Sequence, residues 1–331
     1  MLKLIISASI VALSLSGCGS AIGPIQTFKK VPLQKSSFMP SKEDLDGSKT
    51  KIVLTRIDDS SFKLASNANL GESLRIELEN ELASSGVVEV LDRETAELFD
   101  DEIRLTELQD ENELSNLDDG TLSLPKYAIS GKISNSGFNS TYYKRRCYTN
   151  KKGETSCTPS YYSYKASVDG ILKIHEIPSM KVVKTIEFGD NFVRNEDSSY
   201  YGNSYSRVDT INMLNAAGKK AMYSSRVSLK NFFAQKGYVM EKRLKEDETI
   251  LKISVGRLDG LSQGNNVNIY STKESINPLT NEVEKSTFKV AEGMVSDKLF
   301  EHRAWIIITD TFNKVKLGDY VKVRYAKTLF E

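Results

Sequence analysis

The stretch YKASVDGILKIHEIPSMKVVKTIEF, residues 164–188, decides the fold of the central part of this chain. Apolar and polar side chains alternate through its first half. Six residues therefore share one face: Tyr164, Ala166, Val168, Gly170, Leu172 and Ile174. Because successive side chains of a strand point to opposite faces of a sheet, this pattern predicts a half-buried strand. A turn at residues 178–179 leads into a second run, residues 181–188, and the pair predicts a β-hairpin.

Helical patterns lie on both sides of this hairpin. Residues 70–82 carry leucine at every fourth position, after Asn69 as a candidate N-cap and before Gly86 as a stop signal. Residues 208–233 predict a long second helix with an apolar face. Short strands are predicted at residues 52–54, 87–91 and 127–134, with a further helix over residues 92–108 and an acidic loop over 109–125.

The last third of the chain has a different character. Five short strand candidates occur there, at residues 250–255, 267–270, 287–295, 304–309 and 320–324. Several short strands separated by glycine-containing turns predict a small all-β barrel or sandwich. We therefore expect a first domain over residues 50–240, a boundary at residues 242–247, and a small β domain over residues 249–331.

The N-terminus has the features of an export signal. Residues 1–17 carry a positive charge near their start, at Lys3. About a dozen mostly apolar residues follow, and this run is too short to span a bilayer. Cys18 follows small residues, as in a bacterial lipobox, so we expect it to become an acylated N-terminus. No aspartate follows Cys18, a pattern that resembles outer-membrane lipoproteins. The alternative is an ordinary cleaved signal that contains a cysteine. Residues 18–49 predict an extended, lipidated tether because they contain three prolines and no sustained periodicity.

The bulk composition excludes several classes of function. Charged residues make up 27% of the chain and nearly cancel, with a formal net charge of +1. No overall charge therefore drives the chain toward nucleic acid or an anionic membrane. We find no catalytic motif, no phosphate-binding glycine loop and no metal-ligand cluster, with His175 and His302 as the only histidines. We expect a non-catalytic protein without cofactor or metal.

Cys147 and Cys157 are the other two cysteines. Since an exported chain meets an oxidising compartment, a disulfide between them is expected, and a free or regulatory thiol pair is the alternative. Basic residues and tyrosines surround them: Tyr142, Tyr143, Lys144, Arg145, Arg146, Tyr148, Lys151, Lys152, Tyr161 and Tyr162. Aromatic side chains beside arginine are typical of binding hot spots. This segment predicts a protruding hairpin that binds a partner, anionic lipid or glycan; the alternative is a solvated hairpin with tyrosines packed across its strands.

The order of elements over residues 18–235 resembles the CsgG-like lipoprotein family. The resemblance rests on the lipobox, the proline-containing tether, Leu70-Gly71-Glu72-Ser73-Leu74, the strand end at Asp92-Arg93, the run from Tyr127 to Ile133, and the long hairpin. The tail, with Gly260-Leu261-Ser262-Gln263-Gly264 and Leu317-Gly318-Asp319, is similar to the C-terminal domain of the flagellar assembly protein FlgT. The resemblance implies an α/β domain, with helices over a mixed sheet, that serves in oligomerisation and envelope assembly.

The function expected from this resemblance is a lipid-anchored scaffold at the periplasmic face of the outer membrane. It would assemble surface appendages, flagellar rings or secretion complexes with envelope proteins, and both a single chain and a homo-oligomer are compatible with that role. One alternative is a CsgG-type export channel, in which residues 135–163 and 189–206 form a barrel. Charged residues occur on both faces of these segments, and a charge facing lipid at mid-bilayer costs about 2–4 kcal/mol. Another alternative is an LpoB-like activator of a peptidoglycan synthase.

Overall fold

The structure is a computed structural model that describes residues 20–45, 49–91, 125–197, 207–279, 281–309 and 314–326. The chain divides into two compact units. The sheet unit contains Asp46–Gln235, Leu258–Gly260 and Val323–Glu331, and the barrel unit contains Met1–Leu45, Lys236–Arg257 and Leu261–Lys322. Cys18, the signal segment, the predicted helix over residues 92–108 and nearly all of the acidic loop lie outside the described residues.

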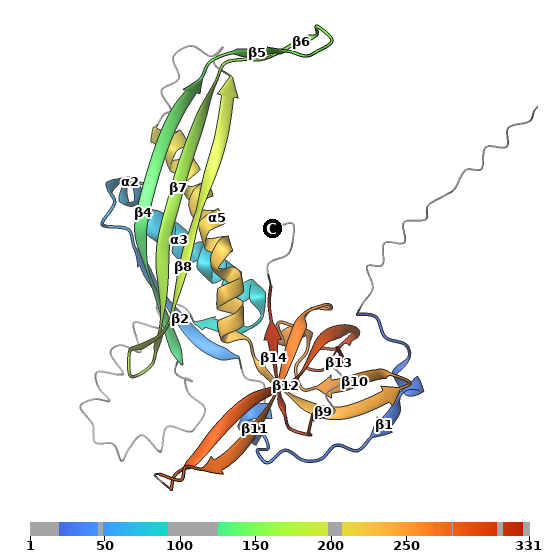
Figure 1. Cartoon of the computed structure of the whole chain (residues 1–331). Coiled ribbons are helices and arrows are strands. Elements are labelled where there is room, and N and C mark those ends of the chain that lie inside the picture. The colour runs from blue at the N-terminus through green and yellow to red at the C-terminus, as the bar shows by residue number, and fades with distance from the viewer. Residues whose placement is uncertain are drawn as a thin grey trace, which may run out of the picture. The chain divides into compact units, whose positions relative to one another are not determined.

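A five-stranded mixed sheet forms the sheet unit, in the order β3-β2-β4-β7-β8 (Figure 1). Its strands are β2 (Thr50–Asp58), β3 (Val88–Leu91), β4 (Tyr127–Tyr143), β7 (Tyr161–Glu176) and β8 (Lys181–Asp197). Strand β2 is parallel to β3 and β4, whereas β4, β7 and β8 are antiparallel. The predicted hairpin is present as β7 and β8. Both strands extend beyond the predicted range, with pairing from Glu176 and Lys181 out to Tyr161 and Asp197.

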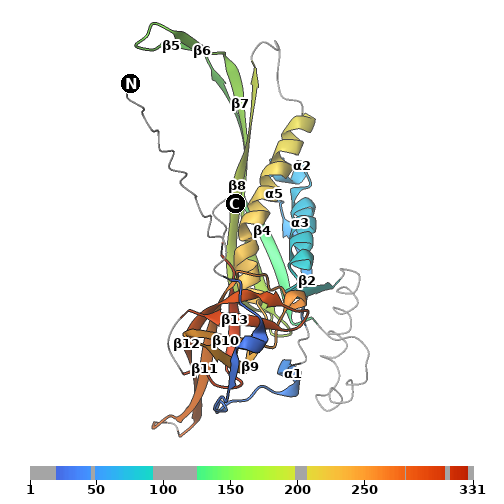
Figure 2. The ribbon, with the colours of Figure 1, turned by 90° about the vertical axis from the view of Figure 1, so that its right-hand side faces the viewer.

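Two helices, α3 (Leu70–Ser85) and α5 (Arg207–Phe233), lie on one face of this sheet (Figure 2). The short helix α2 (Lys63–Asn67) precedes α3. The four leucines of α3 and the alternating apolar residues of β7 belong to one buried cluster with residues of α5. The expected mixed sheet with covering helices is therefore present, but strands exceed helices in the described chain, so the fold is mostly β and only partly α/β.

Helix α3 begins where the sequence predicts, but a different residue caps it. Asn69 occupies the N-cap position with φ 48°, in the left-handed region, and its side chain makes no capping hydrogen bond. The backbone N–H of Gly71 instead donates to Oδ2 of Asp59, at 2.9 Å. Asp59 is only 4% exposed and lies in the preceding loop. A carboxylate twelve residues upstream thus accepts a hydrogen bond from an N–H that has no partner within the helix. Its negative charge also interacts favourably with the positive, N-terminal end of the helix dipole.

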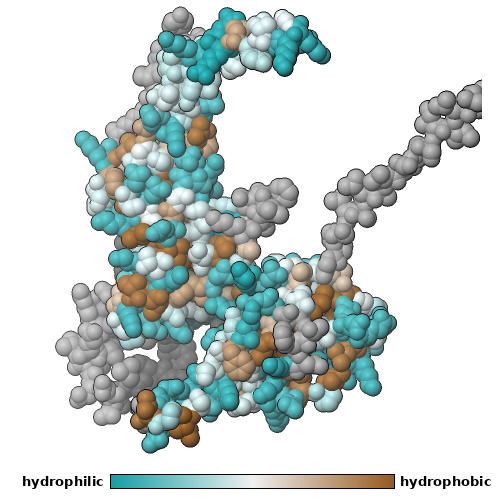
Figure 3. Space-filling model, viewed as in Figure 1, coloured by the Kyte–Doolittle hydropathy of each residue, from teal (hydrophilic) through white to brown (hydrophobic). Residues whose placement is uncertain are grey.

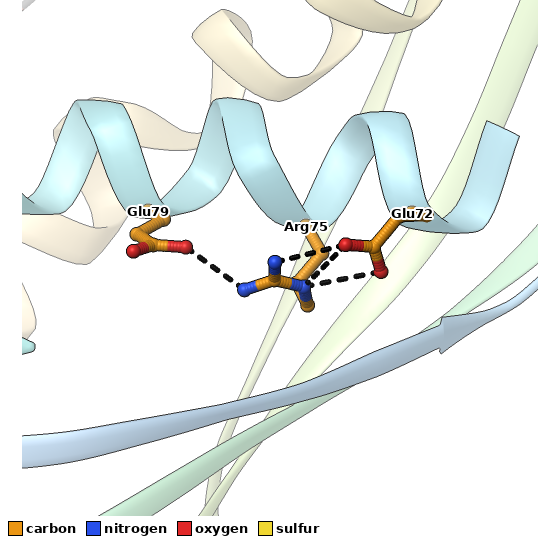
Figure 4. Close-up of polar contacts among 3 residues, drawn as sticks. All are labelled: Glu72, Arg75 and Glu79. Atoms are coloured by element: carbon orange, nitrogen blue, oxygen red, sulfur yellow. Dashed lines mark hydrogen bonds and ion pairs between the residues drawn. The ribbon is translucent and has the colours of Figure 1, made fainter. Parts of the chain in front are cut away.

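Glu72, Arg75 and Glu79 form an ion-pair group along one side of α3 (Figure 4). The Arg75 guanidinium donates to both carboxylate oxygens of Glu72 and, at 2.8 Å, to Glu79. These contacts raise the pKa of Arg75 above its ordinary value, with the hydrogen bond to Glu72 as the main cause. Because pairs at this spacing contribute only about 0.3–0.5 kcal/mol each, the buried leucines decide the position of the helix.

Six strands close into a barrel in the second unit, in the order β9-β10-β13-β12-β11-β14 with β14 paired back to β9. They are β9 (Lys236–Lys245), β10 (Glu248–Ile253), β11 (Asn266–Ile276), β12 (Val283–Leu299), β13 (Ala304–Ile308) and β14 (Tyr320–Arg324). Three short helical segments lie outside the barrel strands: η1 (Ile25–Thr27), α1 (Lys42–Leu45) and η3 (Arg257–Asp259). All five predicted strands are present, and the closed arrangement resolves the choice between barrel and sandwich.

The barrel unit includes two segments that the sequence analysis placed in the tether and in the first domain. Strand β9 begins at Lys236, so the boundary between the units precedes the predicted one at residues 242–247. Residues 18–49 were expected to form an extended tether, but β1 (Lys29–Val31) pairs with β9. Ile22 and Phe28 are buried with Ile250 and Trp305. This part of the segment is packed on the barrel because its few apolar side chains cover the end of the core.

Candidate functional site

Strands β4 and β7 lead into a second hairpin (Figure 1). Its strands, β5 (Arg146–Thr149) and β6 (Thr155–Thr158), form a separate two-stranded sheet. We call residues 144–158 the basic hairpin. Cys147 faces Cys157 in register, and the two are joined in a disulfide with their Cα atoms 4.0 Å apart. The predicted disulfide is therefore confirmed.

The turn of the basic hairpin is organised by one amide side chain. Oδ1 of Asn150 accepts hydrogen bonds from the backbone N–H groups of Lys152 and Glu154, at 2.9 and 3.0 Å. Its Nδ2 donates to the Glu154 carboxylate at 2.7 Å. Gly153 has φ 81°, a conformation that a residue with a Cβ adopts only with strain. The turn therefore has one defined shape although all its residues are exposed or nearly so.

Tyrosines on the last residues of β4 and the first residues of β7 pack in pairs beside the basic hairpin. Tyr142 lies opposite Tyr162 with ring centroids 5.0 Å apart, and Tyr143 lies opposite Tyr161 at 4.8 Å. Tyr162 also stacks on Tyr164, whose burial raises its pKa above the ordinary value. Cross-strand aromatic pairs each contribute about 0.2–1 kcal/mol. These four tyrosines therefore stiffen the base of the hairpin, as the packing alternative predicted.

The basic residues and Tyr148, which complete the predicted partner-binding set, are exposed to solvent. Five basic side chains are exposed on the hairpin: Lys144, Arg145, Arg146, Lys151 and Lys152. In the described part of the chain no ion pair involves any of them. Glu154 is the only acidic residue of the hairpin, so its net charge is strongly positive. Tyr148, on β5, is 72% exposed. The hairpin thus presents one aromatic ring among unneutralised cations.

The structure corrects how the surrounding segments were interpreted. In the channel alternative, residues 135–163 and 189–206 are two polar excursions from the sheet. Residues 135–143 and 161–163 are instead the paired ends of β4 and β7, and β8 continues to Asp197. Residues 198–206 lie outside the described residues. The turn residues Asn150 and Glu154 were missed, although the asparagine-to-glycine spacing of a hairpin turn is a signal for them.

Among the described residues, no helix has the length and apolar character needed to cross a membrane. No protein-family model matches the chain, and no curated protein matches its sequence. Among solved structures, the PelC dodecamer from Paraburkholderia phytofirmans is 12% identical, with a TM-score of 0.23 over 57% of this chain and 94% of that one. A minor lipoprotein from Acinetobacter baumannii is 9% identical, with a TM-score of 0.25 over 54% of this chain and 92% of that one. These TM-scores are too low to infer a shared fold.

Proposed function

We propose that this chain is a lipid-anchored scaffold at the periplasmic face of the outer membrane, and that the basic hairpin binds its partner in an envelope or appendage assembly. The observation that carries the proposal is the exposure of five unneutralised basic side chains on a disulfide-linked hairpin. Exposed positive charge without intramolecular partners favours an acidic partner surface. The role requires no catalysis.

The hairpin has the order that specific binding requires. Association costs free energy for every side chain and loop that becomes immobile on binding. Here the disulfide, the Asn150 turn and the stacked tyrosines fix the backbone before any partner arrives. Arg145, Arg146 and Tyr148 are of the residue types that dominate interface hot spots. A preformed surface of this kind supports specific recognition of a protein over loose attraction to any anion.

A matched pair of variants tests the binding role. Arg145→Ser with Arg146→Ser should leave folding intact and reduce partner recovery by in vivo crosslinking at least about tenfold, since charged hot-spot residues contribute 1–2 kcal/mol or more each. Lys181→Ser with Lys184→Ser removes the same charge from exposed positions of β8 and should leave recovery unchanged. Equal recovery with both double variants would reject the hairpin as the binding surface.

Anchoring is tested separately at Cys18. Acylation at this position should place the protein in the outer-membrane fraction, because several acyl chains give stable anchoring. Cys18→Ala should abolish labelling with a radioactive fatty acid and release the protein from the outer membrane. Deletion of the gene should also leave appendage components mislocalised. Outer-membrane retention of an unlabelled Cys18→Ala protein would contradict the anchor.

A CsgG-type export channel is a second candidate. One observation favours it: the segments expected to be excursions continue as ordered strands at the ends of β4, β7 and β8. Electron microscopy of the detergent-extracted, lipidated protein distinguishes the two functions. Rings with a barrel through the detergent belt would support a channel, whereas particles lying wholly outside the detergent would support the scaffold.

A further inference from the structure

The end of the β11–β12 hairpin in the barrel unit is apolar (Figures 1 and 3). Ile276 and Val283 face each other across the two strands and are 68% and 62% exposed. Leu279, in the connecting turn, is 92% exposed. We call these three residues the apolar tip. Single exposed apolar residues are ordinary, but a group at the end of a projecting hairpin indicates an interaction surface.

Charges around the apolar tip are mainly acidic. Glu274, Glu282 and Glu284 lie within five residues of Leu279 along the chain, and Lys273 and Lys285 each lie six residues from it. Lys285 pairs with Glu274 at 3.7 Å and lies 4.3 Å from the ring centre of Phe38. The surface that receives the tip should therefore be apolar inside and basic around its edge.

The same barrel unit contains a cavity with these properties. Its volume is about 740 Å³, and we call it the basic pocket. Its lining combines three strongly basic residues with three apolar ones: Lys252, Arg257, Arg303, Leu299, Phe300 and Trp305. Glu301 is its one acidic residue, and His302 completes the lining. Arg257 and Arg303 are exposed, and Phe300 is 53% exposed, so both charge and apolar surface are accessible.

The wall of the basic pocket is held rigidly. The N–H of Phe300 donates to the carbonyl of Arg303, and the N–H of Arg257 donates to the carbonyl of Phe300, both at 2.8 Å. The turn between β12 and β13 rests directly on Gly256, where a Cβ would lie 2.3 Å from the Phe300 carbonyl oxygen and 2.5 Å from the Arg303 nitrogen. The pocket is therefore formed in the isolated chain.

The tip cannot reach the pocket of its own chain. The tip is at the start of β12 and the pocket turn follows the end of β12. This strand has 17 residues, and a strand rises ~3.3 Å per residue, so its ends are roughly 50 Å apart. A contact between tip and pocket must join two molecules.

We propose that the apolar tip of one copy inserts into the basic pocket of the next copy of this chain. The two surfaces are complementary in charge and in apolar character, and they lie at opposite ends of one strand. Such a contact uses different patches on the two partners and therefore propagates, giving a ring if it closes and a filament if it does not. The inference goes beyond the scaffold function and is independent of the partner of the basic hairpin.

Complementary variants test this contact in the full-length protein in detergent, with mass measured by sedimentation. The tip variant is Leu279→Asp, and the pocket variant is Arg257→Glu with Arg303→Glu; all three side chains are exposed, so folding should persist. We expect the wild type to form oligomers larger than a dimer. Each variant alone should be monomeric. An equimolar mixture should stop at a dimer, because each mixed pair retains one intact tip and one intact pocket.

Control variants place the same changes elsewhere. Val193→Asp replaces another exposed apolar side chain, 48% exposed on β8, and Lys181→Glu with Lys184→Glu reverses two charges on the same strand. Both should keep the wild-type mass. A monomeric wild type, wild-type assembly by either test variant, or a mixture that stays monomeric would overturn the proposal. Loss of binding to phospholipid vesicles by Leu279→Asp with unchanged mass would assign the tip to a membrane instead.

Discussion

The disulfide of the basic hairpin should order the hairpin without stabilising the rest of the protein. Cys147 and Cys157 are separated by 10 residues, and a link across a loop of that length lowers the entropy of the open chain by the equivalent of about 2.7 kcal/mol. Every residue of β5 and β6 is exposed, so no buried apolar surface adds to this stabilisation. Isolated two-stranded hairpins are marginal in water. The link should therefore decide whether β5 and β6 remain paired.

The perturbation is Cys147→Ser with Cys157→Ser. A loss of about 2.7 kcal/mol corresponds to roughly a hundredfold shift toward the open hairpin. Hydrogen exchange followed by mass spectrometry should show backbone amides of residues 146–149 and 155–158 losing about that factor of protection, while β2 keeps its own. The urea midpoint should barely change. Without the link, residues 144–158 gain conformational freedom in the unfolded chain, but they gain the same freedom in the folded protein because the hairpin is open there, so the two gains cancel.

The wild type treated with reductant is the matching control and should behave like the double serine variant. Two results would refute the reasoning. Retained protection of residues 146–149 would mean that the turn and tyrosine contacts suffice without the disulfide. A drop of about 3 kcal/mol in the free energy of unfolding would mean that the hairpin belongs to the same cooperative unit as the sheet.

Three further predictions concern stability, each measured by urea unfolding. Asp59→Ala should destabilise the sheet unit by about 1–2 kcal/mol, since the N–H of Gly71 loses its acceptor; an unchanged midpoint would show that water replaces it. Leu78→Ala should destabilise it by about 2–5 kcal/mol because the site is 1% exposed, whereas a loss below 1 kcal/mol would contradict the packing. Burial raises the pKa of the Asp319 carboxyl above the ordinary value for aspartate, so the folded state binds the proton more tightly than the unfolded state. Its stabilising contribution is therefore lost as pH rises through the folded pKa. As pH rises above ~4, the ordinary pKa of aspartate, the free energy of unfolding of the wild type should fall relative to that of Asp319→Asn, and parallel pH profiles would exclude this effect.

Local periodicity predicted the parts of the fold that bury one face of a regular element. The alternation in residues 164–174 gave β7 and its buried face, and the four-residue leucine spacing gave α3. The long second helix is present as α5. In each case the spacing of apolar residues matches the repeat of a strand or a helix, so the sequence of that one segment is enough to predict its structure. The disulfide was predictable because compartment and cysteine count left few alternatives.

Contacts between segments far apart in the sequence could not be predicted from local patterns. Strand β1 has three residues, and it pairs with β9 more than 200 residues later. Ile22 and Phe28 lie in a short segment without regular apolar periodicity, so nothing in that segment alone indicates burial. Asn69 is at the predicted N-cap position of α3, but the acceptor that caps the helix, Asp59, lies in a different segment and was missed for the same reason. Such contacts depend on the folded arrangement of the whole unit, which local patterns do not encode.

Charge patterning shows most clearly why the binding surfaces were only partly predictable. A formal net charge of +1 predicts no overall attraction to anionic polymers. That sum conceals a basic hairpin over residues 144–158 and an acidic surround at the apolar tip. The first was recognisable because its charges are consecutive in sequence. The basic pocket was not, because Lys252, Arg257 and Arg303 come together only when β10 and the turn after β12 meet. Opposite charges separated onto different surfaces of one chain favour association with partners at those surfaces even when the whole molecule is nearly neutral.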